Sequence, residues 1–150
     1  MILFKLITKT RHVGIIVRDL KISSKFYTKF LGLKLKKKLI EKGEYFNKLI
    51  GDKRRVAKVV KIDLPDKTYI ELIEFTDSKK IRKIKIEKFD KIKQMHICFT
   101  VKKIDLYFKR LKKLKVEFVS PPLKSDFDPV KTCFFFDPDF NYVQLVEDTI

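Results

Sequence analysis

The sequence predicts an α+β protein made of two copies of one module, each with the order strand, helix and three strands. The only two histidines, His12 and His96, each open a β-branched apolar run, HVGIIV and HICFTV. A segment with apolar residues at helical spacing follows each run, and each half closes on a similar phrase, PDKTYIEL at 65–72 and PDFNYVQL at 138–145. This recurring order is typical of a duplicated supersecondary unit.

The first module is expected between about residues 8 and 75. After its first strand, apolar residues at helical spacing in the segment SSKFYTKFLGL predict a helix that Gly32 ends. A longer excursion, EKGEYFNKLIGDKRR, is punctuated by Gly43 and Gly51. The strands that we expect are residues 12–17, 33–40, 56–64 and 69–75.

The second module is expected between about residues 94 and 148, with a lysine-rich joint at 76–93, so that residues 1–150 form a single domain. Its helix is predicted at 104–114 and a loop at 122–129. The expected strands are residues 96–101, 116–120, 132–136 and 142–147. The offset between modules is 84 residues at the histidines (96 − 12) and 73 at the closing prolines (138 − 65), so the second module is shorter in its middle.

The formal net charge of +17 has two explanations, a polyanionic partner or the lysine bias of an AT-rich genome. The charges are spread along the whole chain, so we favour the compositional explanation and expect no specific nucleic-acid partner. No run approaches the roughly 20 apolar residues that span a membrane, and MILFKLITKT is a poor signal peptide. Two cysteines in apolar runs, Cys98 and Cys133, predict buried thiols in a reducing cytoplasm.

Four polar side chains occupy matching positions of the two modules: His12, Glu71, His96 and Gln144. Side chains alternate faces along a strand, and in all four strands the opposite face is apolar, where a helix is expected to pack. A single histidine in an apolar run is more often a hydrogen-bonded core residue. Because the second histidine falls on the repeat position of the first, we interpret the set as one metal site. Its face also carries the residues expected to line a partly apolar substrate pocket: Tyr69, Tyr142, Ile16 and Ile73.

The phrases HVGIIVRDLKISSKFYTKFLGLKL, PDKTYIELIEF, HICFTV and FFFDPDFNYVQLVE resemble the vicinal oxygen chelate superfamily over about residues 12–147. That family includes glyoxalase I, methylmalonyl-CoA epimerase, extradiol dioxygenases, and fosfomycin- and bleomycin-resistance proteins. The resemblance implies two βαβββ modules in a cupped mixed sheet around one divalent metal, with helices on the outer face. It maps the metal ligands onto His12, Glu71, His96 and Gln144. It also implies a homodimer, with modules assembled within one chain or exchanged between two.

Departures from the family pattern bear on geometry and mechanism. The family's last ligand is commonly Glu, where this chain has Gln144. Glycine is usual where this chain has Lys67, Phe140 and Lys115, so a positive φ at the two turn residues, Lys67 and Phe140, would store about 1 kcal/mol or more of strain.

The resemblance implies a lyase or isomerase of the glyoxalase or epimerase type, using Ni, Co, Zn or Mn on a small substrate chelated through adjacent oxygens. The metal would stabilise a developing enediolate. A carboxamide has no useful basicity, so Glu71 is the expected catalytic base and Glu44 a weaker candidate. A mononuclear iron dioxygenase and a metal-free binding protein of the bleomycin-resistance type are the alternatives. A substrate carboxylate or thioester tail would meet basic residues that are otherwise solvated surface: Arg54, Arg55, Lys58 and Lys61.

Overall fold

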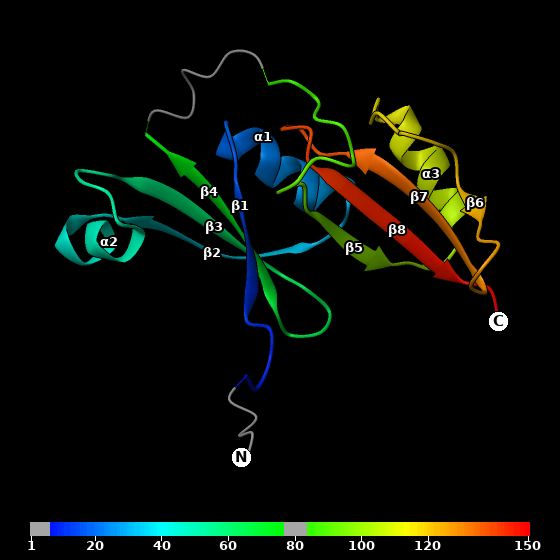
Figure 1. Ribbon diagram of the computed structural model, residues 1–150, viewed down its shortest axis with the longest axis horizontal. Coiled ribbons are helices and arrows are strands. Elements are labelled where there is room, and N and C mark those ends of the chain that lie inside the picture. Colours follow the sequence, from blue (N-terminus) through cyan, green and yellow to red (C-terminus); the bar gives the residue numbers. More distant parts are fainter. Residues whose placement is uncertain (1–6, 77–83) are drawn as a thin grey trace. The chain divides into compact units, whose positions relative to one another are not determined.

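A computed structural model describes residues 7–76 and 84–150 of the chain. The chain forms two compact units, Met1–Lys80 and Ile81–Ile150. Each unit contains one four-stranded mixed sheet and one helix that follows the unit's first strand (Figure 1). The predicted α+β class with two similar modules is therefore confirmed.

Unit 1 contains β1 (His12–Ile16), α1 (Leu20–Lys25), the π-helical segment η1 (Phe26–Phe30), β2 (Lys34–Glu41), α2 (Gly43–Ile50), β3 (Ala57–Asp63) and β4 (Tyr69–Phe75). The sheet order is β1-β4-β3-β2, in which β1 pairs with β4 in parallel and the other pairs are antiparallel. The parallel pair requires a crossover, and the other strands provide it together with the α1–η1 helix.

Two carboxylates hold the N-terminus of α1. Asp19 accepts hydrogen bonds from the backbone N–H groups of Lys21 and Ile22, as an N-cap residue does. Glu74, which is 5% exposed, accepts a bond of 2.7 Å from the backbone N–H of Leu20. Because Tyr27 is fully buried, the α1–η1 helix is anchored on β4 by both polar and apolar contacts.

The excursion expected at 41–55 contains a helix that the sequence prediction lacked. In α2, Phe46 is buried against Ala57 and Val59 and stacks on the ring of Phe75. The C-terminus of α2 is closed by Gly51 at φ 67°, the left-handed position that glycine adopts without strain. The two glycines that suggested loop punctuation therefore flank a helix.

Unit 2 contains β5 (His96–Thr100), α3 (Ile104–Lys113), β6 (Leu123–Lys124), β7 (Val130–Phe136) and β8 (Tyr142–Asp148). The sheet order is β5-β8-β7-β6, with β5 parallel to β8 and the other pairs antiparallel. The carboxylate of Glu147 on β8 accepts the backbone N–H groups of Lys103 and Ile104 at the start of α3. It therefore occupies the place that Glu74 has in unit 1.

The strand predicted at 116–120 is wrong. Only Phe118 pairs there, through an isolated antiparallel bridge to Phe135. Pro121 and Pro122 follow directly, and proline supplies no N–H to extend a ladder. In the joint predicted at 76–93, the described residues 84–93 contain turns and no strand, and residues 77–83 lie outside the described part of the chain.

Three residues that stand where the family favours glycine have left-handed backbones: Lys67 at φ 67°, Lys115 at φ 61° and Phe140 at φ 61°. The strain expected at the two turns is thus present. In the thiol prediction, Cys133 is buried as expected, but Cys98 is exposed. Burial raises the pKa of the Cys133 thiol to about 11, and partial burial also raises that of Cys98.

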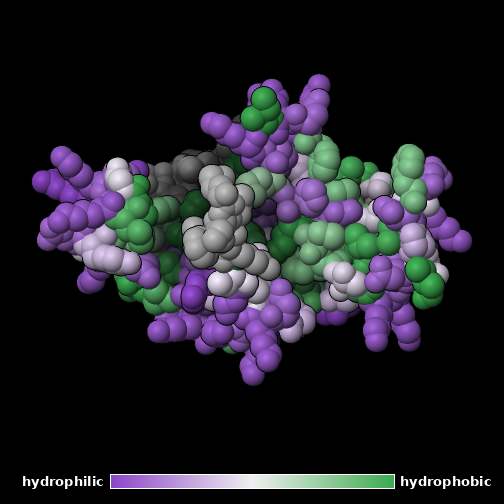
Figure 2. All heavy atoms as spheres, turned by 60° about the horizontal axis from the view of Figure 1, so that its bottom comes forward, coloured by the Kyte–Doolittle hydropathy of each residue, from purple (hydrophilic) through white to green (hydrophobic). Residues whose placement is uncertain are grey.

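The predicted assignment of faces is confirmed on the last strand of each unit. Along β4 the helix-facing Ile70 and Leu72 are fully buried, while Glu71 between them is partly exposed. Along β8 Val143 and Leu145 are buried, and Gln144 is partly exposed. Hydrophilic residues are spread over both units in the view of Figure 2. No helix in the described part of the chain is long and apolar enough to cross a membrane.

Candidate functional site

The candidate ligands of unit 1 lie side by side on neighbouring strands. His12 Nε2 is 3.4 Å from Glu71 Oε2, with the two side chains 37% and 16% exposed. The imidazole of His12 stacks on the ring of Tyr69 at 5.1 Å. Tyr69 was predicted to line a substrate pocket, and this contact shows that its ring also orients the histidine.

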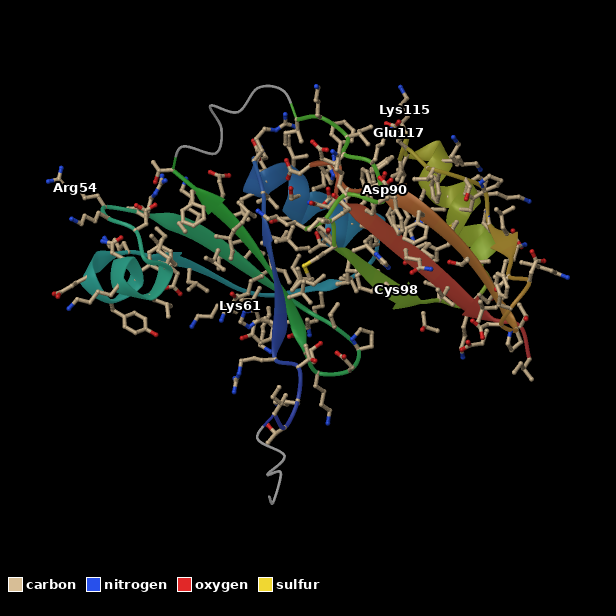
Figure 3. The ribbon with its side chains drawn as sticks, viewed as in Figure 1. Arg54, Lys61, Asp90, Cys98, Lys115 and Glu117 are labelled. Carbon is tan, nitrogen blue, oxygen red and sulfur yellow. The ribbon has the colours of Figure 1, made fainter. Side chains whose placement is uncertain are left out.

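Lys61 completes the charged surroundings of Glu71, and the sequence prediction did not place it there. The register of β3 and β4 sets the two residues opposite each other, and Lys61 Nζ lies 2.9 Å from Glu71 Oε1. The ammonium also lies 4.9 Å from the centre of the Tyr69 ring. The hydrogen bond to Glu71 raises the pKa of Lys61 above its usual range. Lys61 thus occupies one carboxylate oxygen and leaves the other toward His12 (Figure 3).

The candidate ligands of unit 2 form a second pair. His96 Nε2 is 3.2 Å from Gln144 Oε1. The amide of Gln144 is oriented from behind, because its Nε2 donates to Thr132 Oγ1 at 2.9 Å while the Thr132 hydroxyl donates to the carbonyl of Leu145. Since that hydroxyl has one proton, it can only accept from Gln144. The carboxamide therefore presents its oxygen, the atom suited to bind a metal, beside the histidine.

Aromatic side chains surround the second pair, in contrast to the charged residues around the first. The ring of His96 lies 5.1 Å from Phe134 and 5.7 Å from Phe89. Tyr142, predicted to line a substrate pocket, is only 6% exposed, and its hydroxyl donates to the carbonyl of Glu87. Phe89 and Glu87 belong to the predicted joint, so this segment forms part of the histidine's surroundings.

The donor atoms of both pairs have a spacing that fits a shared metal. A divalent metal with bonds of about 2.1 Å to nitrogen and oxygen separates neighbouring ligand atoms by about 3.0 Å at 90° and about 3.4 Å at the tetrahedral angle. The measured separations are 3.4 Å in unit 1 and 3.2 Å in unit 2. Among residues 7–76 and 84–150, no three His, Cys, Asp or Glu side chains form a metal-binding group. Each unit thus offers two candidate ligands.

The remaining predicted residues differ in their surroundings. Ile16 is 57% exposed on β1. Ile73 packs against the cluster formed by Phe46 of α2 and lies beside Gly14. Glu44, the weaker candidate base, is exposed on α2 and pairs with Lys48 at 2.6 Å. Its surroundings are those of a solvated surface residue.

Of the basic residues considered as substrate anchors, Lys61 contacts a candidate ligand. Arg55 instead pairs with Asp52 at 2.7 Å. The positive φ of Arg54 belongs to the turn before β3. Lys58 faces the helix side of the sheet, since it pairs in register with the buried Glu74.

A family model described as the Glyoxalase/Bleomycin resistance protein/Dioxygenase superfamily matches residues 9–145. The chain belongs to this superfamily. The match includes all four candidate ligands and both repeated phrases, so the family resemblance seen in the sequence is confirmed.

Solved structures of this superfamily share the fold. A glyoxalase family protein from Bacillus cereus superposes with a TM-score of 0.83 at 21% identity, covering 99% of each chain. The fosfomycin resistance protein FosX from Listeria monocytogenes superposes with a TM-score of 0.67 at 20% identity, covering 97% of each chain. A FosX structure in complex with Mn(II) and sulfate gives 0.64 at 19% identity, covering 97% of this chain and 96% of that one. Among curated proteins, no sequence matches the chain.

Proposed function

We propose that this superfamily member is a divalent-metal-dependent lyase or isomerase of the glyoxalase or epimerase type. The observation that carries the proposal is the pairing of one imidazole with one oxygen donor in each unit, at the spacing of neighbouring metal ligands. His12, Glu71, His96 and Gln144 are the proposed ligands. When bound, the metal supplies Lewis-acid polarisation of a substrate with two adjacent oxygens.

Glu71 is the proposed base, because it is the carboxylate in the set and a carboxamide cannot accept a proton usefully. Lys61 holds Oε1 of this carboxylate, so that Oε2 is the oxygen presented on the side of His12. Tyr69 restrains the His12 ring by stacking. These contacts keep the carboxylate oriented, which proton abstraction requires.

The substrate proposed is a small molecule with an anionic or oxygen-rich end and an apolar part. The surroundings of the Glu71 pair carry Lys61 and Lys36, both within 6 Å of the Tyr69 ring centre. The surroundings of the His96 pair are aromatic, with Phe89 and Phe134 on the ring. Charged and apolar contacts on separate ligand pairs favour a substrate that presents both kinds of surface.

The test compares Glu71→Gln with Glu44→Gln at saturating metal. Turnover is read as deuterium incorporation from D₂O, followed by proton NMR, in 2-oxo and 2-hydroxy acids and in the hemithioacetal of methylglyoxal and glutathione. Because general-base catalysis typically contributes about 10² to 10⁴ in rate, Glu71→Gln should lose at least about 100-fold, and Glu44→Gln should match the unaltered protein.

Metal content is measured on the same samples, before and after chelation. Stoichiometric Ni, Co, Zn or Mn supports the lyase or isomerase, whereas iron together with oxygen consumption supports the dioxygenase. Absence of stoichiometric metal after reconstitution supports the binding protein. Retained exchange in Glu71→Gln with metal still bound would refute the role of Glu71.

A further inference from the structure

Unit 1 contains a lysine-lined cavity on the face of its sheet opposite Glu71. The cavity has a volume of about 440 Å³ and lies between the α1–η1 helix and strands β2 and β3. Val60 and Leu35 are among its apolar lining residues. The lysines that line it are Lys21, Lys25, Lys29, Lys38 and Lys58. Because Lys58 pairs in register with Glu74, which caps the helix, the cavity is separate from the proposed metal ligands.

The second unit fills the corresponding space with aromatic rings. In unit 2, Phe108 of α3 and Phe118 form an edge-to-face pair at 4.7 Å. The histidine offset of 84 residues relates Phe108 to Ser24, since 108 − 84 = 24. Phe118 bridges Phe135 just as Leu35 pairs with Ile62, and Phe135 and Ile62 differ by the closing-phrase offset of 73. Two large rings in unit 2 thus correspond to Ser24 and Leu35, and both of these line the cavity.

The second unit also closes this space with an ion pair that unit 1 replaces by like charges. Lys131 Nζ lies 2.6 Å from Asp105 at the start of α3. The same offsets relate Asp105 to Lys21 (105 − 84) and Lys131 to Lys58 (131 − 73). Two ammonium groups cannot form the pair that a carboxylate and an ammonium form. Unit 1 is therefore open at the two contacts that close unit 2.

The lining of the cavity has the polar groups of an anion-binding site. Five lysines line it together with one carboxylate, Glu74, whose Oε2 already accepts the backbone N–H of Leu20. The hydroxyl oxygen of Ser24 is buried and has no hydrogen-bond partner within the described part of the chain. A buried hydroxyl without a partner is uncommon and indicates a missing group.

We infer that this cavity binds a small organic polyanion, of the di- or triphosphate class. Its volume lies within the roughly 300–1,000 Å³ of small-molecule pockets. Lysines act as point charges toward phosphate oxygens, and the apolar residues between them can cover the organic part. A single-stranded nucleic acid would need aromatic stacking platforms, and the cavity lining contains no aromatic residue. A second copy of the chain would bring the same positive charge.

The test titrates inorganic tripolyphosphate into the full-length chain by calorimetry at 0.15 M salt. The chain is dialysed against chelator first, so that the probe does not report metal capture. The decisive variant combines Ser24→Phe with Leu35→Phe, which introduces the rings of unit 2 and retains every lysine. Its Kd should rise at least tenfold. Lys25→Gln with Lys29→Gln should have a similar effect.

The matched control is Lys109→Gln with Lys113→Gln, which removes the same charge from the equivalent positions of α3 and should change the Kd less than twofold. Should the double-Phe variant fail to fold by circular dichroism, Lys21→Asp replaces it, because an aspartate there can pair with Lys58 as Asp105 pairs with Lys131. Unchanged binding in the folded cavity-closing variant, or an equal loss in the α3 control, would overturn the inference and assign the affinity to overall charge. These readouts do not depend on the proposed catalytic activity.

Discussion

Replacing Lys61 by methionine should strengthen metal binding at the proposed centre. Lys61 Nζ lies 2.9 Å from the Oε1 atom of Glu71. A metal on the same carboxylate would share that oxygen-rich position with a cation. Methionine keeps most of the apolar stem of lysine and removes the charge, so the contact with Tyr69 is largely preserved.

The size of the effect follows from Coulomb's law. With a metal–oxygen bond of about 2.1 Å added to the Nζ–Oε1 distance of 2.9 Å, the two cations lie at most about 5 Å apart. In a water-like dielectric, a divalent cation and an ammonium at about 5 Å repel by about 1.7 kcal/mol. That value is the appropriate one because Lys61 is 25% exposed and can turn toward solvent. The metal Kd should therefore fall by roughly tenfold.

The assay is competition between the protein and a metal indicator for Zn(II) or Mn(II) at fixed pH. Lys36→Met is the matched control, because Lys36 pairs with Asp63 at 2.7 Å and contacts the same Tyr69 ring without touching Glu71. Its Kd should stay within about twofold of the unaltered protein, as expected for a partly exposed charge further from the ligand. An unchanged or weakened affinity in Lys61→Met would refute the reasoning and make Lys61 a support for Glu71.

Two further predictions concern stability. Lys67→Gly should stabilise the protein by about 1 kcal/mol in urea unfolding, because Lys67 has φ 67°, whereas Phe140→Gly should gain less since the Phe136 ring loses its contact; equal gains would contradict the packing argument. Stability should also fall between about pH 9 and pH 11, because the folded Cys133 thiol keeps its proton up to a pKa of about 11 while the unfolded thiol loses it earlier. Cys133→Ala should flatten that part of the curve measured by thermal unfolding, and an unchanged slope would exclude the thiol as its cause.

Most of the sheet could be predicted from the sequence because strand alternation reports burial directly. The predicted strand at 69–75 agrees with β4 at both ends. The α2 helix was missed because Gly43 and Gly51 were interpreted as loop punctuation, although glycine at φ 67° is also how a helix ends. The strand expected at 116–120 failed because its β-branched composition reports propensity, while pairing depends on a neighbour.

The candidate ligands were predictable from the repeat, but their partners depend on strand register. Lys61 faces Glu71 because the turn at 65–68 pairs Asp63 with Tyr69 and fixes the residues beyond them. Counting equal steps outward from that turn would have found Lys61. Phe89 has no such signal, because it reaches His96 from a segment without regular secondary structure.

The two units differ at their ligand pairs in a consistent way, and this predicts the effect of Gln144→Glu. In unit 1 the carboxylate of Glu71 faces Lys61, whereas in unit 2 the equivalent register position opposite Gln144 is Phe134. Thr132 already donates its proton to a carbonyl, so it cannot donate to a new carboxylate as well.

A carboxylate at position 144 would therefore lie among aromatic rings without the ammonium that Glu71 has. Leaving a partly buried charged group unsatisfied costs about 1–3 kcal/mol, so metal-free Gln144→Glu should lose about 2 kcal/mol of unfolding free energy. Adding Phe134→Lys, which copies the pair of unit 1, should recover at least half of that loss in urea unfolding. Full stability of Gln144→Glu alone without metal would show that the neutral ligand is not matched to its aromatic surroundings.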